Sequence, residues 1–288
     1  MDREGPAIKT IADTARWMAF YRALESERPD AHFQDPYARL LAGERGQEIA
    51  RSLPWGLTNA WALVVRTRVF DELIMNTIEQ QAVDTILNLG AGFDTRPYRL
   101  PLPAWLRWIE VDLPEILAEK EEQLVNEQPS CCLTRVPLDL ADGTARRALF
   151  ARLEHKARQV LVVTEGVLIY LTAEQVGDLA SDLHTSAQFR WWLTDLVSPA
   201  VARWYQLFWA SELAQGKACW RFAPEEGERF FLPYGWHVAQ VRATMEEAAR
   251  LKRDMPLGRL WRLLVSCSPP AVQQAYRTMS CFLLLQRA

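Results

Sequence analysis

Residues 84–114 read DTILNLGAGFDTRPYRLPLPAWLRWIEVDLP. Two short apolar runs in this stretch, Thr85–Leu89 and Trp108–Val111, predict two strands of an open α/β sheet. The first run is followed by the glycine turn Gly90-Ala91-Gly92, and the second is followed by Asp112. Ligands of such sheets lie outside the carboxyl ends of the strands. The stretch therefore predicts a ligand site at this edge of the sheet.

The spacing between the glycines and the acid indicates a nucleoside ligand. Glycine has no Cβ, so the backbone at Gly90 and Gly92 can approach a ligand closely. Asp112 lies 22 positions after Gly90, at the end of the next predicted strand. An acid in this place can accept hydrogen bonds from both hydroxyls of a ribose.

The residues after the turn argue against a dinucleotide. Its fingerprint needs a third glycine, which opens a helix whose N-terminus binds pyrophosphate. Thr95 occupies that position, and Asp94 beside it would repel a phosphate. An acid here instead suits a ligand with a cationic part. S-adenosylmethionine, which carries an ammonium and a sulfonium, fits this requirement.

The segments 88–96 and 110–114 resemble the leucine carboxyl methyltransferase family, which includes bacterial O-methyltransferases associated with polyketide biosynthesis. The resemblance extends to residues 14–36, 66–71, 139–140 and 165–170, which is roughly the first 175 residues. It implies a class I, Rossmann-like α/β fold with a mostly parallel, doubly wound sheet of seven strands. An N-terminal helical extension and a helical lid insertion would complete it, and S-adenosyl-L-methionine would be the cofactor.

The whole chain is expected to form a single methyltransferase domain. Its expected parts are an N-terminal helical cap at residues 1–82 and the nucleotide-binding core at 83–198. The lid insertion at 199–232 and the C-terminal part of the core at 233–288 follow. Residues 115–125 predict a helix, and its charged run Glu119–Glu122 predicts a solvated face. Met279–Gln286 predicts a last strand, antiparallel to a fifth strand at Arg190–Leu196.

Two arginines are expected to bind the carboxylate of the methyl donor. The resemblance implies Arg22, in preference to Arg16, because a basic residue precedes the Asp-Pro pair at 35–36. Arg66 and Arg68 lie two positions apart on a predicted helix and so point to different faces. Arg68 aligns better with the carboxylate-binding arginine of the family, which leaves Arg66 as a structural partner.

The ends of two further predicted strands complete the donor site. The resemblance places Asp139 and Leu140 at the adenine, although an Asp here could also cap the following helix, a role that Asp142 fits as well. Glu165 resembles the glutamate that faces the methionine part of the donor. The full predicted cofactor-binding set is Arg22, Arg68, Gly90, Ala91, Gly92, Asp94, Arg96, Asp112, Leu113, Asp139, Leu140, Glu165 and Gly166.

Aromatic residues gather where the acceptor is expected. They either pack a lid or cover a flat, apolar acceptor, and they are Trp204, Tyr205, Phe208, Trp209, Trp220, Phe222, Phe230 and Phe231. Tyr170 and Asp195 are the candidate catalytic residues. A carboxylate acceptor, with a pKa of about 4, needs no base, whereas a phenol, with a pKa of about 10, would benefit from one. None of the four histidines is predicted at the cleft, which favours a carboxylate.

The predicted function is S-adenosylmethionine-dependent O-methylation of a carboxylate or hydroxyl on a small, aromatic, polyketide-like metabolite. A protein C-terminal carboxyl methyltransferase and a catalytically lapsed binding protein of the same fold are the alternatives. A net charge of −3 gives no electrostatic footprint for nucleic acid. No apolar run approaches the roughly 18 residues of a membrane span, so no membrane partner is expected, and no signal peptide is evident at the N-terminus. Five cysteines without a CxxC pair predict reduced thiols in the cytoplasm. No metal site is expected, and the oligomeric state stays open.

Overall fold

A computed structural model describes residues 8–215 and 219–288 of the chain. Its strands form one sheet of seven, in the order β3-β2-β1-β4-β5-β7-β6. The strands are β1 Thr85–Leu89, β2 Arg107–Asp112, β3 Cys132–Pro137, β4 Val160–Thr164, β5 Phe189–Val197, β6 Trp236–Ala243 and β7 Ser280–Arg287. β7 runs antiparallel to β5 and β6, and the other four pairings are parallel. The predicted fold class is confirmed.

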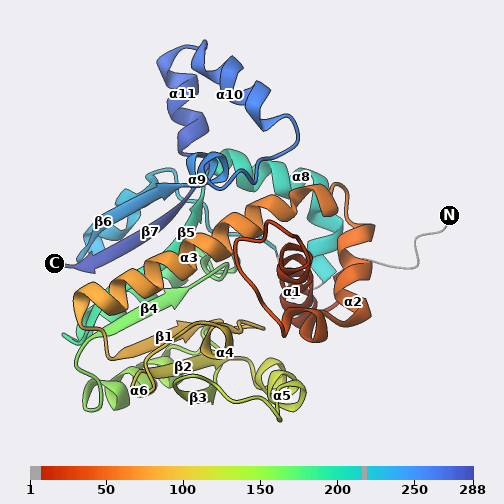
Figure 1. Cartoon of the computed structure of the whole chain (residues 1–288). Coiled ribbons are helices and arrows are strands. Elements are labelled where there is room, and N and C mark those ends of the chain that lie inside the picture. The colour runs from red at the N-terminus through yellow and green to blue at the C-terminus, as the bar shows by residue number, and fades with distance from the viewer. Residues whose placement is uncertain (1–7, 216–218) are drawn as a thin grey trace.

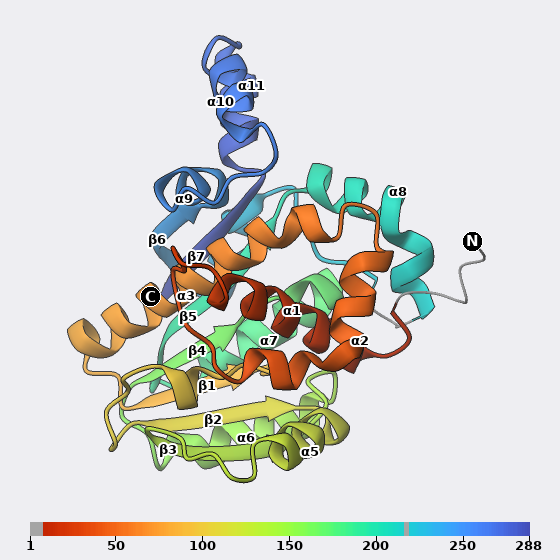
Figure 2. The ribbon, with the colours of Figure 1, turned by 45° about the vertical axis from the view of Figure 1, so that its right-hand side comes forward.

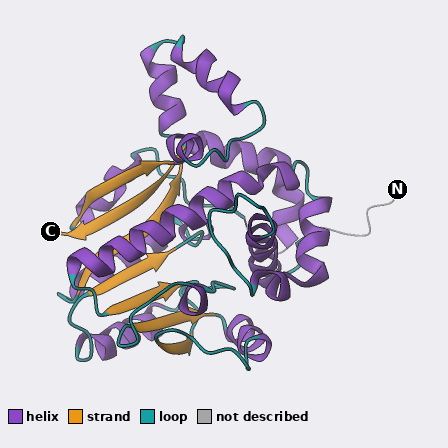
Figure 3. Cartoon of the chain, in the orientation of Figure 1, coloured by secondary structure: helices purple, strands orange, loops and turns teal. Residues whose placement is uncertain are grey.

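Helices cover both faces of this sheet (Figures 1 and 3). The α-helices are α1 Ile11–Ser26, α2 Ala38–Ser52, α3 Ala60–Gln81, α4 Arg96–Arg99, α5 Pro114–Gln123, α6 Gly143–Glu154, α7 Ala173–Thr185, α8 Pro199–Gln215, α9 Thr244–Arg250, α10 Gly258–Ser266 and α11 Pro270–Arg277. Three 3-10 helices are η1 Leu57–Asn59, η2 Leu168–Tyr170 and η3 Gly227–Tyr234. Among the described residues, no helix is both long enough and apolar enough to cross a bilayer.

The core lies in two layers because neighbouring residues of a strand point to opposite faces of the sheet. In β1, Leu87 packs in the layer under α6 and α7, whereas Ile86 packs in the layer under α3 and α9. All five residues of β1 are buried, and so are all five of β4. Burial on both faces explains why these central strands read as continuous apolar runs.

The N-terminal helices α1 and α2 lie beyond the carboxyl ends of β1 and β4 (Figure 1). α1 begins with a capping box, in which Thr10 accepts from the Asp13 N–H and Asp13 accepts from the Thr10 N–H. A separate apolar cluster joins both helices to Phe93 and Ile116, which follow β1 and β2. The N-terminal segment is therefore packed against the edge where the glycine turn lies.

The solvated face predicted for residues 119–122 is wrong at one position. The side chain of Lys120 is completely buried, and its Nζ lies 2.6 Å from Glu110 Oε1 in the middle of β2. Glu110 also accepts from Arg135 Nε of β3 at 3.1 Å. A run of charges shows the polarity of a helix but not which of its residues faces a carboxylate on the sheet.

Breaking this buried pair should destabilise the fold. We expect Lys120→Met to lower the free energy of unfolding by about 3 kcal/mol, because the completely buried carboxyl of Glu110 would lose its nearest cationic partner. Urea denaturation at neutral pH measures the change. The control is Glu121→Gln, an exposed position on the same helix, which should change stability by less than about 0.5 kcal/mol. Equal effects of the two substitutions would show that the pair contributes nothing.

Candidate functional site

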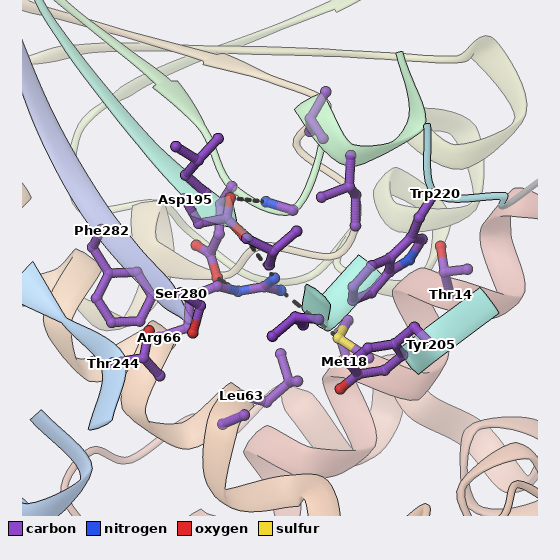
Figure 4. Close-up of a pocket in the computed structure, with 18 of the residues that line it drawn as sticks. Thr14, Met18, Leu63, Arg66, Asp195, Tyr205, Trp220, Thr244, Ser280 and Phe282 are labelled. Carbon is purple, nitrogen blue, oxygen red and sulfur yellow. Dashed lines mark hydrogen bonds and ion pairs between the residues drawn. The ribbon is translucent and has the colours of Figure 1, made fainter. Parts of the chain in front are cut away.

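A cavity of about 1570 Å³ opens at the carboxyl ends of the strands. Its floor carries residues that follow β1, β2 and β4, together with Asp195 of β5, and α1, α3 and α8 contribute walls. Of the predicted cofactor-binding residues, Arg68 alone does not line it. Both candidate catalytic residues, Tyr170 and Asp195, do line it. Figure 4 shows the middle of the cavity, with Arg66 lying between Asp195 and Met18.

The glycine turn brings the backbone of β1 close to the cavity. Gly90 has a φ of +70°, and a Cβ placed there would lie 2.3 Å from Val167 Cγ2. The N–H of Gly92 donates to Asp112 Oδ2 at 2.6 Å, and the N–H of Leu113 donates to Asp112 Oδ1 at 2.7 Å. Burial raises the pKa of Asp112, and these two hydrogen bonds oppose the rise. The turn and the acid are thus held together as one unit.

Arg96 links the turn to two other elements. Its Nη1 lies 3.0 Å from Asp94 Oδ2 and 2.7 Å from Glu165 Oε2, while its Nε donates to Asp71 Oδ1 at 2.7 Å. Arg99 forms two further hydrogen bonds with Asp71, both at 2.7 Å. Burial by itself would raise the pKa of Asp94, but the charge of Arg96, with smaller effects of Lys120 and Arg99, lowers it to about 2.

Arg66, rather than Arg68, reaches the cavity. Its Nε donates to Glu165 Oε1 at 3.0 Å, and its Nη1 donates to Asp195 Oδ2 at 3.3 Å. Arg68 donates to Glu72 and to the carbonyl of His32 instead. Two residues correspond to about 200° around a helix, so only one of the two arginines can face the strand ends. The placement predicted for Arg68 is corrected accordingly.

Arg22 lies in the cavity wall, whereas Arg16 forms an ion pair with Glu119, and the contact of Arg22 with the donor carboxylate stays a prediction. Asp35 orients Arg22, since its Oδ2 accepts from Arg22 Nε at 2.8 Å. The same carboxylate oxygen accepts from Thr95 Oγ1 at 2.7 Å. The Asp-Pro pair therefore has a structural role: its acid connects α1 to the segment after the glycine turn.

The adenine candidates lie at the rim of the cavity. Asp139 Oδ1 accepts from the N–H of Ala141, and Leu140 also lines the cavity. Asp142 is the N-cap of α6, because its Oδ1 accepts from the N–H groups of Thr144 and Ala145. Capping does not require Asp139, so its side chain can face a ligand. Its contact with adenine stays a prediction.

The aromatic residues divide into two groups. Phe222 and Phe231 are buried in the core, where Phe231 and Trp192 meet edge to face with ring centroids 5.2 Å apart. Tyr205 and Trp220 stack in the cavity wall, with centroids 4.1 Å apart (Figure 4). Phe230 packs against the core, whereas Trp204 lines the cavity and contacts Phe208. The side chain of Trp209 falls outside the described part of the structure.

The two candidate catalytic residues are both constrained. Asp195 accepts from the N–H of Gly166 at 2.7 Å with Oδ1 and from Arg66 with Oδ2. Burial raises the pKa of Asp195, and Arg66 opposes this rise. Burial also raises the pKa of Tyr170 to about 12. No histidine is found among the described residues that line the cavity. Nor does any group of three or more His, Cys, Asp or Glu in the described chain lie close enough together to hold a metal ion.

Three residues of the site were not assigned to ligand binding from sequence. They are Asp35, Arg66 and Asp71, of which Arg66 was expected only as a structural partner, and each pairs with a residue at least 13 positions away in the chain. Their only signal in the sequence is charge within segments that otherwise bury an apolar face. That signal marks a buried ion pair but does not identify its partner.

This fold and this site define the class of S-adenosyl-L-methionine-dependent methyltransferases, and comparison with known proteins agrees. A protein from Frankia alni that is named, provisionally, an S-adenosyl-L-methionine-dependent methyltransferase is 34% identical over 84% of this chain and 89% of its own. A DUF574 family protein from Streptomyces avermitilis has the same fold, with a TM-score of 0.60 at 13% identity over 96% of this chain and 97% of its own. A methyltransferase from Thermobifida fusca, also named provisionally, gives a TM-score of 0.56 at 14% identity over 98% and 96%.

The model of the leucine carboxyl methyltransferase family matches residues 15–184. This match covers more than half of the chain, so the chain belongs to that family. Its cofactor is S-adenosyl-L-methionine. Both statements confirm the resemblance seen in the sequence.

The lowered pKa of Asp94 makes stability depend on acid pH. A carboxyl whose folded pKa is lowered contributes stability above its unfolded pKa and loses it as pH falls toward the folded value. We expect the wild type to lose roughly 2 kcal/mol more than Asp94→Asn between pH 5 and pH 2. Urea denaturation across that range measures the difference. Parallel curves for the two proteins would contradict the ion pair between Asp94 and Arg96.

Measuring donor binding can test whether Arg66, and not Arg68, belongs to the donor site. We expect Arg66→Gln to weaken S-adenosylmethionine binding about tenfold or more, because a charged hydrogen bond to a ligand contributes roughly 1.5–3 kcal/mol. Arg68→Gln is the matched control and should leave the dissociation constant within about twofold. Calorimetry gives both constants, and circular dichroism checks that each variant is folded. A larger loss in Arg68→Gln would restore the assignment made from sequence.

Proposed function

We propose that this methyltransferase acts on an oxygen of a small molecule with a large, aromatic, apolar body, and that this oxygen belongs to a carboxylate. The observation that carries the proposal is the contrast between the two ends of one cavity. Its inner end is built from ion pairs at the strand ends, and its outer end is walled by aromatic side chains. A charged donor and an apolar acceptor would meet between them.

The net charge of the inner end is complementary to the net charge of the donor. Four carboxylates and three arginines form the buried network, which leaves one negative charge; they are Asp71, Asp94, Glu165, Asp195, Arg66, Arg96 and Arg99. S-adenosylmethionine carries an ammonium, a sulfonium and a carboxylate, and so has one net positive charge. Asp112 stands apart at the end of β2, where it can accept from ribose hydroxyls. When bound, the donor supplies a methyl group that is already activated by the positive sulfur.

The outer end suits a large apolar acceptor. The whole cavity exceeds the roughly 300–1,000 Å³ of ordinary ligand sites, so there is room for a second molecule beside the donor. Trp55, Trp61, Trp204 and Trp220 line it from four separate segments. Flat aromatic walls favour flat apolar ligands, which stack on them.

Support for a carboxylate comes from the state of the nearby acids and phenols. Asp195 has both oxygens in hydrogen bonds, and the raised pKa of Tyr170 keeps its hydroxyl protonated at neutral pH. Burial raises the pKa of Tyr205 to about 12 as well. A carboxylate acceptor arrives ionised and needs no base. Alignment of its oxygen with the methyl carbon would then be the main contribution of the protein.

Methyl transfer from labelled donor to a panel of acceptors tests this proposal. The panel contains aromatic acids, matched phenols and short peptides with a free C-terminus. We expect label in the aromatic acids, and mild alkali should release it as volatile methanol because the product is an ester. The rate should change little between pH 6 and pH 9, since the acceptor is ionised throughout.

Each other outcome points to a different function. Label that is stable to alkali, with a rate that rises with pH, would mean an ether and therefore a hydroxyl acceptor. Transfer to peptides alone would mean a protein carboxyl methyltransferase. Donor binding by calorimetry without transfer to any member of the panel would count against the proposed acceptors and agree with a lapsed enzyme.

A further inference from the structure

Helix α10 carries an unusually broad apolar face. Its sequence GRLWRLLVS places apolar residues at i, i+3, i+4, i+7 and i+8 from Leu257, and Leu263 widens the stripe. Two arginines and a serine form the narrow polar strip that remains. Four leucines on this helix and at its N-cap are half exposed or more. Their exposed fractions are 71% for Leu257, 50% for Leu260, 61% for Leu263 and 52% for Leu264.

The acceptor cavity accounts for only one side of this helix. Trp261 and Val265 line the cavity, together with Val272, Ala275 and Tyr276 of α11. The four leucines do not line it, so a ligand in the cavity would leave them in water. Burying a leucine is favourable by roughly 1.5–3 kcal/mol. Such a cluster of exposed leucines therefore indicates a surface that contacts something outside the chain.

The hairpin of α10 and α11 stands away from the rest of the protein, as both Figure 1 and Figure 2 show. Of its described helical residues, Gly258 alone is buried. The hairpin projects at the same end of the molecule as α8 (Figure 2).

The C-terminal region that contains the hairpin has a net charge opposite in sign to that of the remaining chain. Residues 244–288 contain seven Lys and Arg and three Asp and Glu, a net charge of +4, whereas residues 1–243 carry −7. No acid occurs after Asp254. Two hairpin arginines have acidic partners, Arg262 with Asp254 and Arg277 with Glu246. Arg259, on the polar strip of α10, is exposed and forms no ion pair with a described residue.

We propose that the α10–α11 hairpin binds the surface of an anionic lipid bilayer. An amphipathic helix with leucine and tryptophan on a broad face and arginine on the other lies in the plane of such an interface. Each cation near an anionic leaflet adds attraction of about fivefold in affinity. Surface binding needs no membrane-spanning segment. The sequence-based expectation of no membrane partner rested on the lack of such a segment.

This orientation would also bring the part of the cavity that the hairpin lines close to the lipid. Trp261 and Val272 line the cavity on the same hairpin whose leucines would enter the bilayer. An apolar acceptor could then pass from the lipid to the donor without crossing water. This consequence rests on the proposed function, whereas binding of the hairpin to lipid does not.

Co-sedimentation of the full chain with sucrose-loaded vesicles tests the proposal. We expect the protein to pellet with vesicles of phosphatidylcholine and phosphatidylglycerol at a ratio of about 3:1, and about fivefold more weakly with phosphatidylcholine alone, since Arg259 has no acidic partner among the described residues. Leu260→Ser combined with Leu264→Ser should weaken pelleting with the anionic vesicles about tenfold or more. Arg259→Glu should reduce the preference for anionic lipid.

The matched control is Leu40→Ser, because Leu40 of α2 is exposed to a similar extent, 54%, and lies outside the cavity. It should pellet like the wild type. Absence of pelleting with anionic vesicles overturns the proposal, and so does equal pelleting of the wild type and the double leucine variant. A wild-type dimer in light scattering that the double variant converts to a monomer also overturns it, because a second copy would then cover the leucines. Pelleting requires neither donor nor acceptor, so failure here leaves the proposed methyl transfer untouched.

Discussion

A network of buried ion pairs fixes how the parts of this protein meet. It joins α3, the segment after β1, the end of β4 and β5 through Arg66, Arg96, Arg99, Asp71, Asp94, Glu165 and Asp195. A charge that loses its partner inside a protein costs several kcal/mol. The elements can therefore dock only where every arginine finds its carboxylates, and that position opens the cavity at the strand ends.

The same network prepares the donor site before any ligand binds. Glu165 and Asp94 are held by arginines, and Asp112 is held by backbone N–H groups on the glycine turn. Groups held in place by other contacts lose little freedom when a ligand arrives, which is the benefit of preorganisation. The acceptor end is built differently. Its walls are aromatic side chains on α3 and α8, on the segment before α3 and on the segment after α8, and shape rather than charge would select the ligand there.

Several features of the site follow directly from sequence because they depend on neighbours in the chain. Asp142 caps α6 through N–H groups two and three residues away, and Gly90 takes a positive φ where the strand turns. Lys120 and Arg66 behave differently. Lys120 lies in a charged run typical of a solvated helix, yet it is buried against Glu110 of β2. The choice between Arg66 and Arg68 depends on which side of α3 faces β4 and β5.

The sequence by itself determined the fold class, the methyl donor and the turn and acid that would hold its nucleoside. The α/β sheet edge, the turn and the acid arise from local periodicity, from glycine conformation and from a spacing within one βαβ unit, all of which are contained in about 30 residues. The seven-stranded class and the donor follow from the family resemblance, which extends over roughly the first 175 residues. Only the tertiary structure decided which arginine enters the cavity, how Asp195 is engaged and which aromatic residues face a ligand. It also left the leucines of α10 uncovered. Such outcomes depend on contacts between distant segments, and a single sequence contains no record of which segments meet.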